Sequence, residues 1–177
     1  MSIAATIIRD EHRALASVIK ALQFLIQEIQ NRGQKPDFAL LQAIVSYVEQ
    51  FPDKLHHPKE DQYLFPALRL RYPASATDLD ILQDEHERGA AVTTRVVETL
   101  REYAADPAHF EAFAQAVDDY ANFHWSHMHR DENVILPLAE AHLPPPDWTP
   151  INAAFNSNSD PLVAINTQRE FRDLFRR

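Results

Sequence analysis

Two segments of the chain decide its fold: HHPKEDQYLFP at residues 56–66 and HMHRDENVILP at residues 127–137. Both begin with histidine, carry an acidic pair at the fifth and sixth positions, and close with proline. Four residues advance an α-helix about 40° past a full turn, so the first histidine and the first acid of each segment share one helix face. His56 pairs in this way with Glu60, and His127 pairs with Asp131. Each segment therefore predicts a helix that presents one imidazole and one carboxylate to the same side.

A second, shorter repeat precedes each of these segments. DEHR at residues 10–13 matches DEHE at residues 84–87. The shorter match is offset by 74 positions, from His12 to His86, and the longer match by 71, from His56 to His127. The chain thus resembles two copies of one helical hairpin. If the copies fold with approximate twofold symmetry, they bring two equivalent sets of histidine and carboxylate ligands together in the core.

The spacing of apolar residues and of helix-ending residues predicts an all-α protein. The expected helices cover residues 2–32, 37–72, 76–105 and 107–142. Pro52, Pro58 and Pro66 each lack a backbone donor, so the second helix should bend or break. Short connections make neighbouring helices antiparallel. The sequence therefore predicts an up-down-up-down four-helix bundle that occupies residues 1–143.

Residues 144–177 are expected to form a separate C-terminal tail. The sequence PPPDWTPINAAFNSNSDP, which follows Leu143, predicts an extended segment with turns. Further on, residues 168–177 place Phe171, Leu174 and Phe175 on one side of a short amphipathic helix. We expect the tail to pack on the bundle or to join a second chain in a homo-oligomer.

The composition excludes several classes of site and partner. The chain has no cysteine, so any metal must be held by nitrogen and oxygen rather than by thiolate. A formal net charge of -9 argues against nucleic acid as a partner. The N-terminus lacks a signal sequence, and no stretch approaches the roughly 20 apolar residues that a membrane span needs. We therefore expect a soluble, cytoplasmic protein that binds neither nucleic acid nor membrane.

The repeated ligand types point to a transition metal in the core. Imidazole nitrogen combined with carboxylate oxygen suits iron first, with manganese and zinc as competitors. A single buried histidine is more often a hydrogen-bonded core residue, but here four histidines and two carboxylates recur in one order and spacing. His57, His124 and His129 lie near the repeated positions. They are candidates for a fifth nitrogen ligand or for a hydrogen-bond partner of a ligand.

Together these motifs resemble the hemerythrin family, in its HHE cation-binding branch. The resemblance covers about residues 5–140 and implies a dinuclear non-haem iron site with two bridging carboxylates. Carried over position by position, it implies these ligands: His12, His56, Glu60, His86, His127 and Asp131. Glu132 competes with Asp131, because oxygen-carrying hemerythrins place their last acidic ligand five residues after its histidine. Those carriers also have a histidine at the position of Ala90, so this site is expected to hold fewer nitrogens.

The function that follows from this resemblance is reaction with a small oxidant. We expect two iron ions that bind or react with O2, peroxide or nitric oxide, in a sensor, a scavenger or an iron-handling protein. The alternative is a four-helix interaction module with a structural metal or none. A ferritin-like oxidase fits less well, because those bundles use Glu-x-x-His and the order here is reversed.

Overall fold

The chain is helical throughout the part that the structure describes. The computed structural model describes residues 2–157, 160 and 162, and no β-strand occurs among them. The α-helices are α1 (Ile3–Arg32), α2 (Phe38–Gln50), α3 (His57–Lys59), α4 (Phe65–Arg71), α5 (Ala76–Ala105), α6 (Phe110–Arg130), α7 (Leu136–His142) and α8 (Pro145–Asn156). Shorter turns connect them: π-helical η1 (Pro52–His56), η2 (Glu60–Leu64) and η5 (Asp131–Ile135), and 3₁₀-helical η3 (Pro73–Ser75) and η4 (Pro107–His109).

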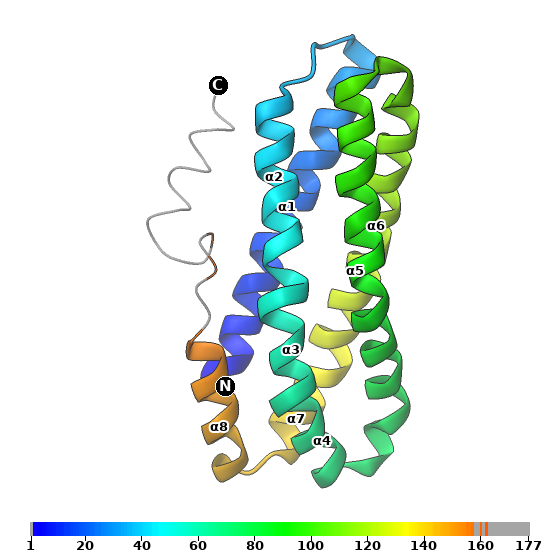
Figure 1. Cartoon of the computed structure of the whole chain (residues 1–177). Helices are drawn as coiled ribbons and strands as arrows, with labels where there is room; N and C mark the ends of the chain where they lie inside the picture. Colours follow the sequence, from blue (N-terminus) through cyan, green and yellow to red (C-terminus); the bar gives the residue numbers. More distant parts are fainter. Residues whose placement is uncertain (1, 158–159, 161, 163–177) are drawn as a thin grey trace.

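These elements form long helical columns that lie side by side (Figure 1). The columns are α1, the segment 38–71, α5 and the segment 110–142, and their bounds agree with the four helices that the sequence predicts. Among the described residues, no helix combines the length and the apolar character that a membrane crossing requires.

The column ends follow the capping chemistry expected from the sequence. The Ser2 hydroxyl accepts a hydrogen bond from the backbone N–H of Ala5 at 3.1 Å, and the Asp37 carboxylate accepts one from Leu40 at 3.0 Å. Such side chains satisfy donors that have no acceptor in the first turn. At the other end of α1, Gly33 takes a left-handed conformation with φ of 62°. That conformation suits glycine and ends the helix.

Prolines break the second and fourth columns where the sequence places them. The π-helical turns η1, η2 and η5 each end two positions before a proline, namely Pro58, Pro66 and Pro137. In each case the residue before the proline donates to the carbonyl five positions back; Phe65, for example, donates to Glu60. A proline has no N–H for the regular bond to the fourth residue back, and the wider turn absorbs the mismatch. The turns η2 and η5 begin at Glu60 and Asp131, so the same irregularity sits beside both repeated acids.

The buried side chains form two apolar clusters, one on each side of a polar layer. The first cluster includes Leu15, Leu22 and Val117, and the second includes Ile8 and Leu64. On α1, the buried His12 lies between Ile8 of one cluster and Leu15 of the other. The polar residues of the repeat therefore lie midway along the columns, enclosed by hydrocarbon at both ends.

The prediction of an extended segment after Leu143 is wrong for residues 145–156, which form α8. Pro145 and Pro146 fall in the first turn, where backbone donors have no intrahelical acceptor, so their missing N–H groups cost little. Pro150 lies inside the helix and removes one regular hydrogen bond. Local sequence alone therefore favours a break, and tertiary packing overrides it.

Packing against α1 and the second apolar cluster holds α8 in place (Figure 1). Trp148, Ile151 and Phe155 are buried there, and each such side chain contributes about 1.5–3 kcal/mol relative to exposure. The Asn152 side chain also accepts a hydrogen bond at 2.8 Å from the backbone N–H of Ala4, in the first turn of α1. The helix expected at residues 168–177 lies outside the described residues.

Candidate metal centre

All six residues that the repeat singles out meet in the polar layer. His12 comes from α1, His56 from the end of η1, His86 from α5 and His127 from α6. Each of the four imidazoles is at most 9% exposed, and the carboxylates of Glu60 and Asp131 are fully buried. His12 and His86, 74 positions apart in the sequence, thus lie in one cluster, because each hairpin contributes an equivalent set of histidine and carboxylate side chains.

The two carboxylates lie between two pairs of imidazoles. Glu60 Oε1 is 3.4 Å from His56 Nε2, and Glu60 Oε2 is 3.4 Å from His86 Nε2. Asp131 Oδ2 is 3.1 Å from His127 Nε2 and 3.9 Å from His12 Nε2. Each carboxylate therefore faces one imidazole from each hairpin. This is the arrangement that two cations bridged by two carboxylates require.

The outer nitrogen of each imidazole binds a second carboxylate. His56 Nδ1 lies 2.7 Å from Glu11, and His127 Nδ1 lies 3.0 Å from Glu85, within the same hairpin. Across the hairpins, His86 Nδ1 lies 3.0 Å from Asp61, and His12 Nδ1 lies 3.0 Å from Glu132. A carboxylate on Nδ1 directs the lone pair of Nε2 inward and fixes the ring, as outer partners of metal ligands do.

Sequence reasoning missed three of these outer partners, namely Glu11, Asp61 and Glu85. The signal was present, because Glu11 and Glu85 each precede a repeated histidine and Asp61 follows Glu60 as Glu132 follows Asp131. The open choice between Asp131 and Glu132 also has a geometric answer: Asp131 faces the imidazole cluster, and Glu132 lies on the outer side of His12.

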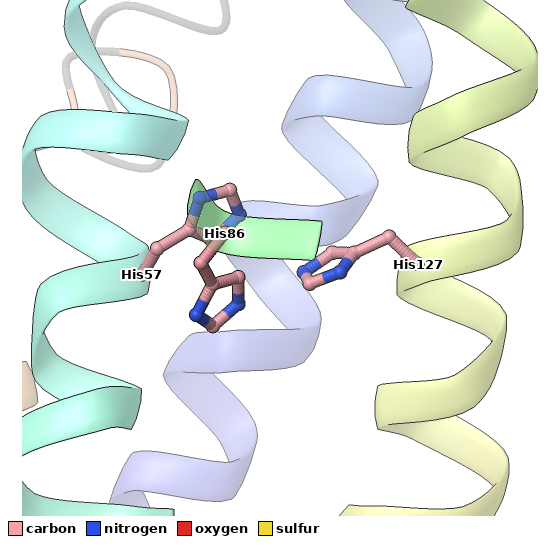
Figure 2. A group of neighbouring side chains, drawn as sticks. All are labelled: His57, His86 and His127. Carbon is pink, nitrogen blue, oxygen red and sulfur yellow. The ribbon is translucent and has the colours of Figure 1, made fainter. Parts of the chain in front are cut away.

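His57 joins the cluster as a third imidazole beside His86 and His127 (Figure 2). Its ring stacks on that of His86 with centroids 4.2 Å apart, and one nitrogen from each of the three residues lies within 4.8 Å of the others. Ala90 predicts fewer nitrogens, with His57 as one candidate for a fifth, and the structure places the His57 ring beside the cluster. His124 is fully buried but stands behind His57, with ring centroids 6.2 Å apart, and His129 is exposed.

Among the described residues, the group that contains His12 and His56 includes no third imidazole. In the repeat, the counterpart of His57 is Met128, which lines a cavity of about 20 Å³ beside His12 and His56. This volume exceeds the minimum of about 10–15 Å³ for one water molecule. His57 and His127 line the same cavity, so it touches imidazoles of both halves. The halves still differ at this position, because one carries the His57 imidazole and the other the Met128 thioether.

Comparison with protein families identifies the domain. The sequence model of the hemerythrin HHE cation-binding domain matches residues 4–139. The chain belongs to this family. Comparisons with curated proteins and with solved structures found no significant match.

The two central carboxylates of this hemerythrin domain have opposite pKa shifts. Burial raises the pKa of Glu60, but His56 and His86 outweigh burial and hold it well below its usual range. Burial and the negative charge of Glu60 together raise the pKa of Asp131 to about 7. The protein's own charges thus keep one carboxylate ionised and leave the other partly protonated at neutral pH. A cation would allow both to ionise.

The pKa values of the imidazoles in the hemerythrin site are also shifted in opposite directions. Burial lowers the pKa of His86, but hydrogen bonds with Asp61 and Glu60 raise it more, to about 9. At His56 burial is likewise outweighed by neighbouring carboxylates, and the pKa is raised well above its ordinary value. At His57 burial prevails, assisted by the charge of His86, and its pKa is lowered well below that value. His57 therefore offers an uncharged nitrogen lone pair at neutral pH.

The inward-facing nitrogen and oxygen atoms are better placed to bind a metal ion than to form hydrogen bonds with one another. His12 Nε2 and His56 Nε2 lie 3.2 Å apart, and both rings already donate through Nδ1 to carboxylates. When the rings are neutral, two lone pairs face each other, an arrangement that needs a proton or a cation between them. Both oxygens of Glu60 and of Asp131 are buried without a hydrogen bond from the described residues. Buried polar atoms are rarely left in this state, so the residues present fit the cations that the family name implies.

Proposed function

We propose that this hemerythrin domain holds two iron ions and reacts with a small oxidant: O2, peroxide or nitric oxide. The observation that carries the proposal is the placement of Glu60 and Asp131 between two sets of inward-facing imidazoles. Manganese and zinc are the competing metals, since the same nitrogen and oxygen ligands accept them. We place the protein in the cytoplasm and assign its four columns to an up-down-up-down bundle, supported by the short turns between them.

The ligands divide into two positions that share the carboxylates. His12 and His56 form one position, and His57, His86 and His127 form the other. Glu60 and Asp131 bridge the two. Glu132 is assigned outside the ligand set, as the hydrogen-bond partner of His12, because its carboxylate lies on the outer nitrogen of that ring.

The unequal halves indicate where an oxidant binds. Octahedral iron has six ligand positions. The half with His57 has three imidazoles and two carboxylates, whereas the half with His12 and His56 has one imidazole fewer and so leaves more positions for an added ligand. The cavity that both halves line is the space through which a small oxidant would approach that position. Ferrous ions, when bound, supply the electrons that reduce it.

The residues of the chain control how the reaction proceeds. Glu11, Asp61, Glu85 and Glu132 fix the four rings, so no ligand has to reorient. The two apolar clusters above and below the layer exclude bulk water from the iron pair and from the oxidant beside it. The polar side chains that line the cavity favour oxidation of iron over a reversible O2 adduct.

The test combines metal analysis with optical spectra. Protein loaded with ferrous iron without air should hold about two ions per chain and, after addition of O2, peroxide or nitric oxide, should change its visible absorption. His12→Ala and His86→Ala should each lower the metal content, and His109→Ala, at an exposed position, should not. A colourless protein that holds zinc or no metal and responds to none of the oxidants would favour an interaction module instead.

A further inference from the structure

A tyrosine and an aspartate, Tyr47 and Asp160, line the cavity beside the imidazole cluster. Tyr47 lies on α2 and is 7% exposed, and its hydroxyl donates a hydrogen bond to Asp160 Oδ2 at 2.9 Å. Asp160 follows α8 and is 8% exposed. Its second oxygen accepts a hydrogen bond at 2.8 Å from the backbone N–H of Leu162.

Packing around this pair keeps it close to the cluster and away from solvent. The Tyr47 ring stacks on Phe51 with centroids 4.9 Å apart, and Met128 and Leu15 complete the apolar part of the wall. The space has room for little more than one water molecule. Tyr47 and Asp160 therefore line the same small space as His12 and His56.

The pair has no counterpart in the other half of the duplicated domain. The residue 71 positions after Tyr47 is Asp118, which is exposed. Asp160 lies outside both repeats, in the segment that follows α8. Among the described residues, the hydrogen bond between Tyr47 and Asp160 thus has no equivalent in the second hairpin. It joins the two side chains to each other, and Asp160 is held further by the backbone of Leu162.

We propose that Tyr47 is a one-electron donor to an oxidant held in this cavity, with Asp160 as the acceptor of its proton. The proposal rests on the proposed function, because it requires iron and an oxidant beside His12 and His56. A buried phenol gives up an electron readily only if its proton leaves at the same time, since a phenol radical cation is strongly acidic. A carboxylate oxygen at 2.9 Å that already accepts the phenolic hydrogen bond is placed to take that proton.

The step balances when the iron pair can supply only one electron. Hydrogen peroxide takes one electron from the remaining ferrous ion, which becomes ferric, and one electron from Tyr47, which becomes a neutral phenoxyl radical. The O–O bond breaks, and two protons are consumed, one lost by Tyr47 through Asp160 and one drawn from water. The products are two water molecules, the hydroxide ion left by the water that gave its proton, one newly formed ferric ion and the radical. Tyr47 thus supplies the electron that a half-reduced iron pair lacks.

Electron paramagnetic resonance of rapidly frozen samples tests the proposal. Iron-loaded full-length protein, reduced to one ferrous and one ferric ion, is mixed with hydrogen peroxide and frozen at increasing times. We expect a tyrosyl radical signal that rises as the ferrous ion is oxidised. Tyr47→Phe should abolish the signal and retain the iron content. Asp160→Asn should form it at least about tenfold more slowly, because an amide is a far weaker proton acceptor than a carboxylate.

Tyr103→Phe is the matched control. Tyr103 is 4% exposed and belongs to the same apolar cluster as Tyr47, but it does not line the cavity. Its variant should give the full radical signal. A signal that survives Tyr47→Phe would overturn the proposal, as would a visible phenolate-to-iron absorption that disappears in Tyr47→Phe, because Tyr47 would then be a ligand.

Measurements of metal content and of iron oxidation distinguish a failure of this inference from a failure of the proposed function. If two ions bind and peroxide oxidises them without any radical, Tyr47 is not a donor and the proposed function stands. If iron does not bind, or if peroxide leaves ferrous iron unchanged, both conclusions fail together.

Discussion

Metal loading at neutral pH should expel protons from the site. Without metal, His86 has a pKa of about 9 and His56 one well above its ordinary value, so both rings are almost fully protonated at pH 7. Asp131, with a pKa of about 7, is about half protonated. Metal ligands must be deprotonated, so filling both positions at pH 7 should release about two to three protons per chain.

Calorimetric titration in two buffers of different ionisation enthalpy measures this release. The heat per ion bound should differ between the buffers in proportion to the number of protons set free. His86→Ala should lower the release by about one proton, since it removes one protonated ring. His109→Ala, at an exposed position, should leave it unchanged. Two bound ions with release of less than one proton at pH 7 would refute the reasoning.

The same shifts set how the stability of the metal-free protein depends on pH. The pKa of His86 is raised from 6.5 to about 9, so the folded state binds its proton more tightly than the unfolded state does. This contribution is fully present below pH 6.5 and is lost as pH rises through about 9. At 1.36 kcal/mol per unit it amounts to about 3 kcal/mol at most. The stabilisation by metal should increase over the same range, because fewer protons then compete, and melting curves of both forms at pH 6.5 and 8.5 measure the difference.

Four further substitutions, in two matched pairs, test the roles of site and packing residues. Asp131→Asn should lower the metal content to one ion or none, whereas Glu132→Gln should retain two ions with about 10–100-fold weaker affinity, as measured by competition with a chelator; equal losses would contradict the assignment of Glu132 as an outer partner. Phe155→Ala should destabilise the protein by about 3–5 kcal/mol in urea unfolding, because this ring of α8 is fully buried in the second apolar cluster. Leu70→Ala, where the side chain is 75% exposed, should change stability by less than about 0.5 kcal/mol. Similar effects of the two substitutions would mean that α8 contributes little to stability.

The four columns were predictable because their signals are local. Ser2 and Asp37 cap helices, Gly33 ends one, and prolines mark the breaks, so each boundary depends on residues within one turn of it. The helix at 145–156 was not predictable in this way. Its prolines favour a break locally, and the burial of Trp148 and Phe155 against the second apolar cluster becomes visible only once the columns are assembled.

The inner residues of the site were predictable for a different reason. Duplication repeats the order of histidine and acid, so the pattern identifies His12, Glu60 and their counterparts without any knowledge of the fold. The outer carboxylates repeat as well, but a carboxylate next to a ligand also fits a solvated helix face. Which face it occupies depends on the packing between columns. Asp160 has no repeated counterpart, because it lies outside the duplicated hairpins, and so no repeat could identify it as a residue that lines the cavity.

Two substitutions on a duplicated scaffold make the site asymmetric. The backbone gives both hairpins the same inward histidine, the same acid and the same proline-linked π turn, so equal side chains would create two equal metal positions. At the residue after the second repeated histidine, one copy has His57 and the other Met128. The imidazole adds a nitrogen beside His86, whereas the thioether lines open space beside His12. Asp160, from outside the duplication, also hydrogen-bonds to Tyr47, a contact that has no equivalent at Asp118 in the second hairpin among the described residues. Differences at single positions, rather than in the helical framework, thus make the two halves of the site unequal.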